Sequence, residues 1–176
     1  MATAPRREAH PLNRLEEIED SEEAMKRVLA SGAFEILHPG HLKFLEEAKR
    51  LGGEGSRLVV VVARDETVRR RKGRDPILGE EARRYMVSRL KPVDEAVLGC
   101  SPFSFEKIIE EVKPDIVVFG YDQEDIMRSF TEFVKKRGLR IKVVKLGRFS
   151  SPEPCSTTEL LEKASRLMGL GGSRSH

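Results

Sequence analysis

The sequence predicts a doubly wound α/β fold, in which helices cover both faces of a five-stranded parallel sheet. Two observations carry this prediction: short runs rich in β-branched residues alternate with longer amphipathic segments, and two of the runs are apolar throughout. Alternating strands and helices are typical of parallel sheets with right-handed crossovers. A strand that is apolar along its whole length indicates burial on both faces of the sheet.

Strands are predicted at 28–34, 58–63, 93–98, 116–119 and 141–146. The second and fourth runs are the continuously apolar ones, and Pro92 and Pro114 stand just before the third and fourth. Sheets of this kind bind ligands beyond the carboxyl ends of their strands. Functional residues are therefore expected just after each run.

Helices are predicted where apolar residues recur with the 3.6-residue period of an amphipathic helix. This pattern occurs at 39–51, 105–112, 126–134 and 160–168. Gly52-Gly53 follows the first of these segments and Gly138 follows the third, which places glycine where helices commonly end. Each segment lies between two predicted strands or after the last one, as the alternating fold requires.

Charged residues make up 35% of the 176-residue chain and are unevenly distributed. Residues 1–25 carry three arginines against seven acidic residues, whereas the remainder carries 29 basic and 22 acidic residues. We expect an acidic helical extension at 1–25, one globular domain at 26–168 and a disordered tail at 169–176. The basic body favours anionic ligands such as nucleotides, phosphorylated metabolites or nucleic acid.

Composition excludes several classes of protein. No apolar run approaches the roughly 18 residues that a membrane span needs, so no membrane partner is expected. A signal peptide is not expected either, because no apolar segment follows Arg6 and Arg7. The chain has two cysteines, Cys100 and Cys155, too few for a disulfide scaffold, and a reducing cytoplasm is the expected location.

A polyphosphate site is predicted after the first strand, where the chain reads SGAFEILHPGH. His38 and His41 are three residues apart, so both imidazoles face the same way on a helical turn. Gly40 carries no side chain, which lets a ligand come close. The free N–H groups of the helix N-terminus, the two imidazoles and Lys43 together form a donor cluster for phosphate oxygens.

Other interpretations of this turn are a zinc site and a pair of solvated helix-cap imidazoles. Zinc takes three or four protein ligands, and the other histidines, His10 and His176, stand at the two ends of the chain, so no metal site is predicted. A P-loop and a dinucleotide fingerprint are excluded, because no G-x-x-x-x-G-K-[ST] occurs and the G-x-G at 53–55 follows a helix.

Three downstream segments hold further candidates. Five cations occur in the six residues 69–74, and this segment is expected to form a loop. The cations could form a solvated face. A nucleic-acid-binding patch is disfavoured because no aromatic residues stand among them. After the fourth strand, Asp122 could contact a base or ribose, or cap a helix. The hydroxyls at 156–158 could cap the last helix and also hold a phosphate. A redox role for the neighbouring thiol of Cys155 is a hypothesis beside that of a small, partly buried side chain.

The histidine turn resembles the H-x-G-H signature of the nucleotidyltransferase superfamily, in its cytidylyltransferase-like branch. This resemblance implies a Rossmann-like doubly wound sheet of the nucleotidyltransferase type. It also implies transfer of a nucleoside monophosphate from a nucleoside triphosphate to an anionic acceptor. The branch usually has Gly-Thr-Phe-Asp before the histidines; here Ala33 replaces the threonine and Glu35 replaces the aspartate. Ala33 keeps a backbone N–H for the nucleotide, and Glu35 carries its carboxylate one methylene further out.

From about residue 28 to 167 the chain resembles the archaeal FAD synthase family, through VARD at 62–65, LKPVD at 90–94, KPDI at 113–116 and GYDQ at 120–123. The resemblance implies transfer of AMP from ATP to FMN, giving FAD and pyrophosphate, with Mg²⁺ or another divalent cation. A homodimer is one compatible oligomeric state. A cytidylyltransferase acting on a polyol or alcohol phosphate is an alternative, although such enzymes usually have arginine where Ser151 stands and a tryptophan, which this chain lacks. A non-catalytic nucleotide-binding relative is another.

The resemblance also implies roles for individual residues. His38, His41 and Lys72 are the expected catalytic residues, which would donate to phosphate oxygens. The residues expected to bind the nucleotide are Ala33, Phe34, Gly40, Lys43, Arg83, Gly120, Asp122, Ser156, Thr157 and Thr158. For Arg83, an ordinary surface position on a helix is the alternative.

Overall fold

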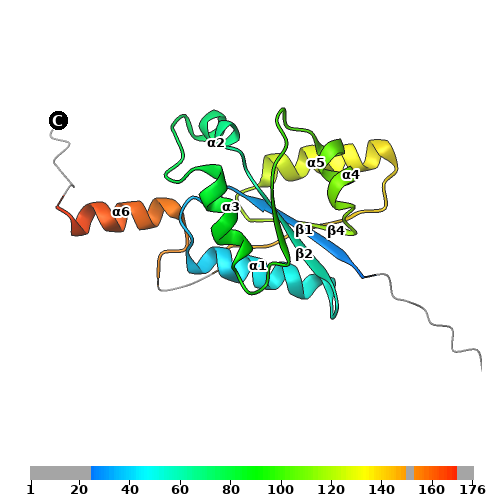
Figure 1. Cartoon of the computed structure of the whole chain (residues 1–176), viewed down its shortest axis with the longest axis horizontal. Helices are drawn as coiled ribbons and strands as arrows, with labels where there is room; N and C mark the ends of the chain where they lie inside the picture. Colours follow the sequence, from blue (N-terminus) through cyan, green and yellow to red (C-terminus); the bar gives the residue numbers. More distant parts are fainter. Residues whose placement is uncertain (1–24, 150–152, 170–176) are drawn as a thin grey trace, which may run out of the picture.

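The computed structural model describes residues 25–149 and 153–169. Five parallel strands form one sheet in the order β3-β2-β1-β4-β5, with helices on both faces (Figure 1). The strands are β1 (Arg27–Gly32), β2 (Arg57–Val62), β3 (Glu95–Leu98), β4 (Ile116–Phe119) and β5 (Lys142–Lys145). The helices are α1 (Pro39–Gly52), α2 (Asp65–Lys72), α3 (Glu80–Ser88), α4 (Phe105–Val112), α5 (Glu124–Arg137) and α6 (Thr157–Leu167). The predicted doubly wound fold is confirmed.

The strand order reverses between β1 and β4. Val28 of β1 pairs with Leu58 of β2 on one side and with Ile116 of β4 on the other. The chain moves outward from β1 through β2 to β3, and then returns to β4 and β5 on the opposite side of β1. The carboxyl ends of β1 and β4 therefore form the crevice where sheets of this type bind ligands.

The sheet separates two apolar cores, because successive side chains of a strand point to opposite faces. Val28 and Ala30 of β1 lie in the core that includes residues of α1 and α3. Leu29, between them, lies in the core that includes residues of α4 and α5. In β2 every residue from Leu58 to Val62 is buried, which explains why its run is apolar throughout.

Besides shifts of up to about three residues at the ends of predicted elements, two helices differ from the sequence-based expectation. Residues 69–72 were expected on a loop but form the end of α2, which stops at Gly73 in a left-handed conformation. Val68 is the one buried residue of α2, so the sequence of this helix has no periodic apolar stripe that would have predicted it. The final helix, α6, has the predicted amphipathic pattern but extends away from the sheet (orange in Figure 1), and none of its residues is buried within the described structure.

The expected helical extension and tail lie outside the described residues, except for Met25 and Gly169. Within the part of the chain that is described, no helix has the length and apolar character that a bilayer span requires.

Candidate active site

A cavity of about 490 Å³ opens at the carboxyl ends of β1 and β4. Its lining combines the turn after β1, part of α2, the turn after β4 and the start of α6. This volume lies within the range of ordinary small-molecule sites. All of the predicted site residues line the cavity except Lys43, which is exposed on α1, and Arg83.

The two histidines form a stacked pair at the start of α1. Their ring centroids are 3.7 Å apart and the ring planes differ by 22°. The backbone N–H of His41 donates to Nδ1 of His38 over 3.3 Å, so His38 caps the helix that carries His41. Because Nδ1 of His38 accepts, the proton of its neutral ring is on Nε2. Nδ1 of His41 is buried without a hydrogen-bond partner among the described residues.

Both imidazoles are neutral near pH 7. Burial lowers the pKa of His41 to about 3. The Lys72 ammonium, and His38 whenever it is protonated, lower the pKa further, whereas a hydrogen bond with the backbone of Ile36 raises it. Burial also lowers the pKa of His38, more than the carboxylates of Glu159 and Asp122 raise it. A neutral imidazole has one N–H. The N–H of His38 can donate to a phosphate oxygen, whereas His41 must first exchange its hydrogen bond with the Ile36 backbone for one to the phosphate.

Glycine is required at position 40 because neighbouring parts of the protein leave no room for a side chain. A Cβ atom at this position would lie 2.7 Å from the carbonyl oxygen of Cys155 and 3.1 Å from Nδ1 of His38. The segment before α6 therefore lies against Gly40, which also lines the cavity, and the approach of a ligand to this glycine stays a prediction. This close approach brings the start of α6 into the cavity wall beside the start of α1.

The start of α6 is stabilised by two capping hydrogen bonds. Ser156 Oγ accepts from the N–H of Glu159 over 3.2 Å, and the Glu159 carboxylate accepts from the N–H of Cys155 over 2.8 Å. The cap uses a lone pair of Ser156 and leaves its O–H as a donor. Cys155 is buried. The N-termini of α1 and α6 both border the cavity, and such termini favour anions.

Glu35 connects the cavity to the segment between α2 and α3. Its buried carboxylate accepts from Nη1 and Nη2 of Arg74 over 2.8 and 3.3 Å, and from the N–H of Ile77 over 3.3 Å. It also forms an ion pair with Lys72. Burial raises the pKa of Glu35, but the hydrogen bonds from Arg74 and Lys72 outweigh it and hold the pKa below its usual value. Glu35 is therefore an ionised anchor that holds Lys72 at the cavity wall.

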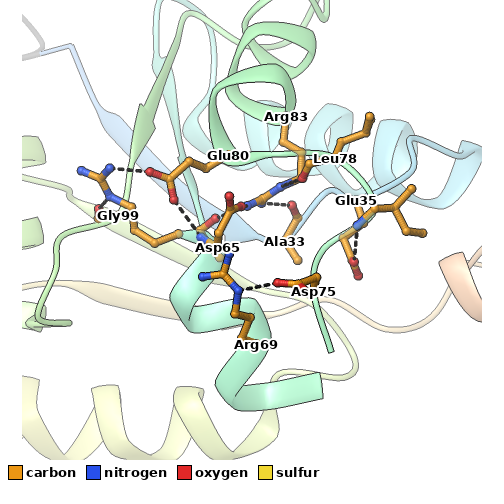
Figure 2. Close-up of polar contacts among 12 residues, drawn as sticks. Ala33, Glu35, Asp65, Arg69, Asp75, Leu78, Glu80, Arg83 and Gly99 are labelled. Carbon is orange, nitrogen blue, oxygen red and sulfur yellow. Dashed lines mark hydrogen bonds and ion pairs between the residues drawn. The ribbon is translucent and has the colours of Figure 1, made fainter. Parts of the chain in front are cut away.

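Arg83 is not a cavity residue, which contradicts its predicted role as a phosphate ligand. Its side chain is fully buried. Nε donates to the Leu78 carbonyl over 2.9 Å (Figure 2). Nη1 donates to the Ala33 carbonyl over 2.5 Å, and Nη2 donates to the Ala63 carbonyl over 2.8 Å and to Asp65 over 2.7 Å. The guanidinium joins the segments after β1 and β2 to α3, so its donors are used inside the protein.

Gln123 is a site residue to which the sequence assigned no role. Its Oε1 accepts from the N–H of Gly120 over 2.7 Å, and its Nε2 donates to the Ser31 carbonyl over 3.1 Å. The buried side chain thus joins the carboxyl ends of β4 and β1. Gln123 is the N-cap position of α5, so the alternative that Asp122 caps this helix is not borne out.

Arg148 was also missed, because it follows β5 in a segment without a recognisable motif. It lines the cavity, forms an ion pair with Glu159 and lies 5.7 Å from the ring centroid of Tyr121. The contact with an aromatic face and the ion pair place a guanidinium between the turn after β4 and the start of α6.

Known proteins match this chain over most of its length. The cytidylyltransferase-like family model matches residues 29–163. An FAD synthase of Methanothermobacter marburgensis is 47% identical over 148 residues, which cover 84% of this chain and 91% of that protein. An FAD synthase of Aciduliprofundum boonei is 49% identical over 139 residues, covering 79% and 90%.

A solved structure is also similar to this chain. The protein, described as a lipopolysaccharide core biosynthesis protein from Thermoplasma volcanium GSS1, is 43% identical, with a TM-score of 0.64. The match covers 72% of this chain and 99% of that one.

Proposed function

The chain belongs to the cytidylyltransferase-like family, and we propose that it is an FMN adenylyltransferase, which transfers AMP from ATP to FMN and releases pyrophosphate. The observation that carries nucleotidyl transfer is the stacked, neutral pair of His38 and His41 between two helix N-termini. The choice of FMN as acceptor is supported by the archaeal FAD synthases that share 47% and 49% identity with this chain.

The proposed reaction is a single in-line displacement. An oxygen of the FMN phosphate forms a bond to the α-phosphorus of ATP, and the bond from that phosphorus to the bridging oxygen of pyrophosphate breaks. Pyrophosphate leaves with the electron pair. The second pKa of a phosphate monoester is about 6, so the attacking phosphate is mostly a dianion at pH 7 and needs no general base. Catalysis then consists of positioning and charge stabilisation.

His38 and His41 are proposed to donate to α- and β-phosphate oxygens, where negative charge increases as the bond to pyrophosphate breaks. Lys72 is proposed to exchange Glu35 for a phosphate oxygen. Arg74 would remain on Glu35, so this exchange does not leave a buried carboxylate unpaired.

The remaining roles belong to the two helix N-termini and the turn after β4. Ser156, Thr157 and Thr158 at the start of α6 are proposed to hold phosphates through their O–H and N–H groups. Gly120 and Asp122 are proposed to contact the adenosine, and the backbone of Ala33 and Phe34 to border the α-phosphate. All of these residues line the same cavity.

A divalent cation such as Mg²⁺ is expected to arrive on the phosphates of ATP. The described residues include no group of three or more His, Cys, Asp and Glu side chains that could hold a metal ion. When bound, the cation would neutralise phosphate charge. A cytoplasmic location is proposed because both cysteines are free thiols, as is usual in a reducing compartment.

The test is a nucleotide panel with the purified full chain. We expect FAD and pyrophosphate to form in equal amounts from ATP and FMN, and no corresponding product from CTP and FMN. Transfer of CMP from CTP to a polyol phosphate would identify a cytidylyltransferase instead. Binding of ATP without pyrophosphate release for any acceptor would identify a non-catalytic relative.

A further inference from the structure

One end of the cavity is apolar. Its lining there consists of Phe103, Phe105, Ile108, Ile126 and Phe130, and we call this part the apolar arm. Leu29 and Val117, which belong to the core shared with α4 and α5, also line the cavity. The apolar arm therefore reaches from the carboxyl ends of the strands toward the space between the sheet and these two helices.

Phe103 stands at the entrance of the apolar arm and is 41% exposed. Its ring meets that of Phe105 edge to face, with centroids 4.9 Å apart and planes at 80°. Phe103 and Phe105 thus form a contiguous aromatic pair in the cavity lining, a kind of surface that small-molecule sites commonly use.

The turn that carries Phe103 is held at both ends. The N–H of Ser104 donates to Sγ of Cys100 over 3.2 Å, and Ser101 Oγ donates to Glu66 of α2 over 3.0 Å. Ser104 also caps α4, because its Oγ accepts from the N–H of Lys107 over 3.3 Å. The aromatic rim is thus fixed before any ligand arrives, and a fixed contact surface reduces the entropy lost on binding.

We propose that the apolar arm binds the isoalloxazine ring of FMN, an inference that rests on the proposed function. This ring is flat, and its dimethylbenzene edge is apolar, which suits a pocket of aromatic edges and faces. The apolar arm belongs to the same cavity as His38 and His41, so a flavin seated there can extend its phosphate toward ATP. Adenine is the competing occupant, but Gly120 and Asp122 provide its proposed contacts at the end of β4.

The test compares four proteins: the wild type, Phe103→Ala, Phe103→Tyr and Tyr85→Ala. Tyr85 is an exposed aromatic residue of α3 outside the cavity lining and serves as the matched control. Because Phe103 is partly exposed, its truncation should not prevent folding. Two readouts are used: the KM values for FMN and ATP, and the fluorescence anisotropy of riboflavin, which lacks the phosphate, titrated with each protein.

We expect Phe103→Ala to raise the KM for FMN about tenfold, as loss of one aromatic stacking contact does, and to leave the KM for ATP unchanged. Riboflavin affinity should fall by a similar factor, while Phe103→Tyr and Tyr85→Ala resemble the wild type. If the wild type makes FAD but Phe103→Ala keeps a normal KM for FMN, or raises the KM for ATP instead, the inference is overturned and the proposed function stands. If the wild type makes no FAD, the proposed function fails. In that case, riboflavin binding by the wild type that is lost in Phe103→Ala still supports a flavin site in the apolar arm. If the wild type does not bind riboflavin, the inference is overturned as well.

Discussion

Replacement of Arg83 by methionine gives the sharpest test of the internal role that the structure assigns to this residue. Its guanidinium is fully buried and donates four hydrogen bonds, to three carbonyl oxygens and to Asp65. Methionine fills much of the same volume but leaves all four acceptors without this donor. Breaking a buried ion pair costs about 3–5 kcal/mol, and an unsatisfied buried acceptor about 1–3 kcal/mol.

Some of these acceptors will regain water, since the side chain of Asp65 is 24% exposed. We therefore expect a loss of about 4 kcal/mol in the free energy of unfolding, which lowers Tm by roughly 8–16 °C in a protein of this size. The assay is urea and thermal unfolding followed by circular dichroism, with Arg84→Met as the control, because Arg84 is an exposed neighbour paired with Glu81.

ATP binding separates this structural role from the phosphate contact that the sequence suggested. A typical domain has 5–15 kcal/mol of stability, so the folded Arg83→Met protein can be studied at low temperature. We expect it to bind ATP there, because no donor of Arg83 reaches the cavity. Wild-type stability combined with lost ATP binding would refute this reasoning and restore Arg83 as a phosphate ligand.

Three further predictions concern the site. His41→Ala should lower kcat by about 10²–10³ with its fold intact, as loss of one transition-state donor does, while Lys43→Ala keeps near-normal turnover; equal turnover by both variants would contradict the assignment. Gly40→Ala should raise the KM for ATP, because the added Cβ would lie 2.7 Å from the Cys155 carbonyl oxygen, and an unchanged KM would show that the start of α6 does not hold phosphate. The free energy of unfolding should fall as pH drops below 6.5, because His41 takes up a proton in the unfolded chain but, with a pKa of about 3, not in the folded protein. The contribution of this group to the slope is at most about 1.4 kcal/mol per pH unit. Urea titrations at several pH values should show that His41→Ala lacks this contribution.

The sheet was predictable because β2 and β4 are apolar runs, and because α1, α4 and α5 have clear periodicity. In contrast, α2 was missed because Val68 is its one buried residue among charged neighbours. Periodic burial is the signal on which sequence reasoning depends, and a helix attached to the core by one residue does not produce it.

The histidine pair was predictable because its spacing is local and its turn has a specific motif. The partners of Gly40, Glu35 and Arg83 were not, since each contacts residues distant in the sequence. Arg83 shows the limit most clearly: an arginine three residues after Glu80 fits a phosphate contact or a surface pair, and the buried carbonyls that it binds become visible only in three dimensions. Glu35 departs from the family pattern, which has aspartate at this position. The structure explains how its carboxylate is used, because Glu35 forms ion pairs with Lys72 and Arg74.

A crystal structure of the full chain with FMN and an ATP analogue that has a methylene group between the α- and β-phosphorus tests the central claim most directly. The prediction is that α- and β-phosphate oxygens lie about 2.7–3.2 Å from ring nitrogens of His38 and His41, with an oxygen of the FMN phosphate about 3–3.5 Å from the α-phosphorus, opposite the leaving group. Triphosphate bound away from the two imidazoles, for example along the arginines of α2, would contradict it.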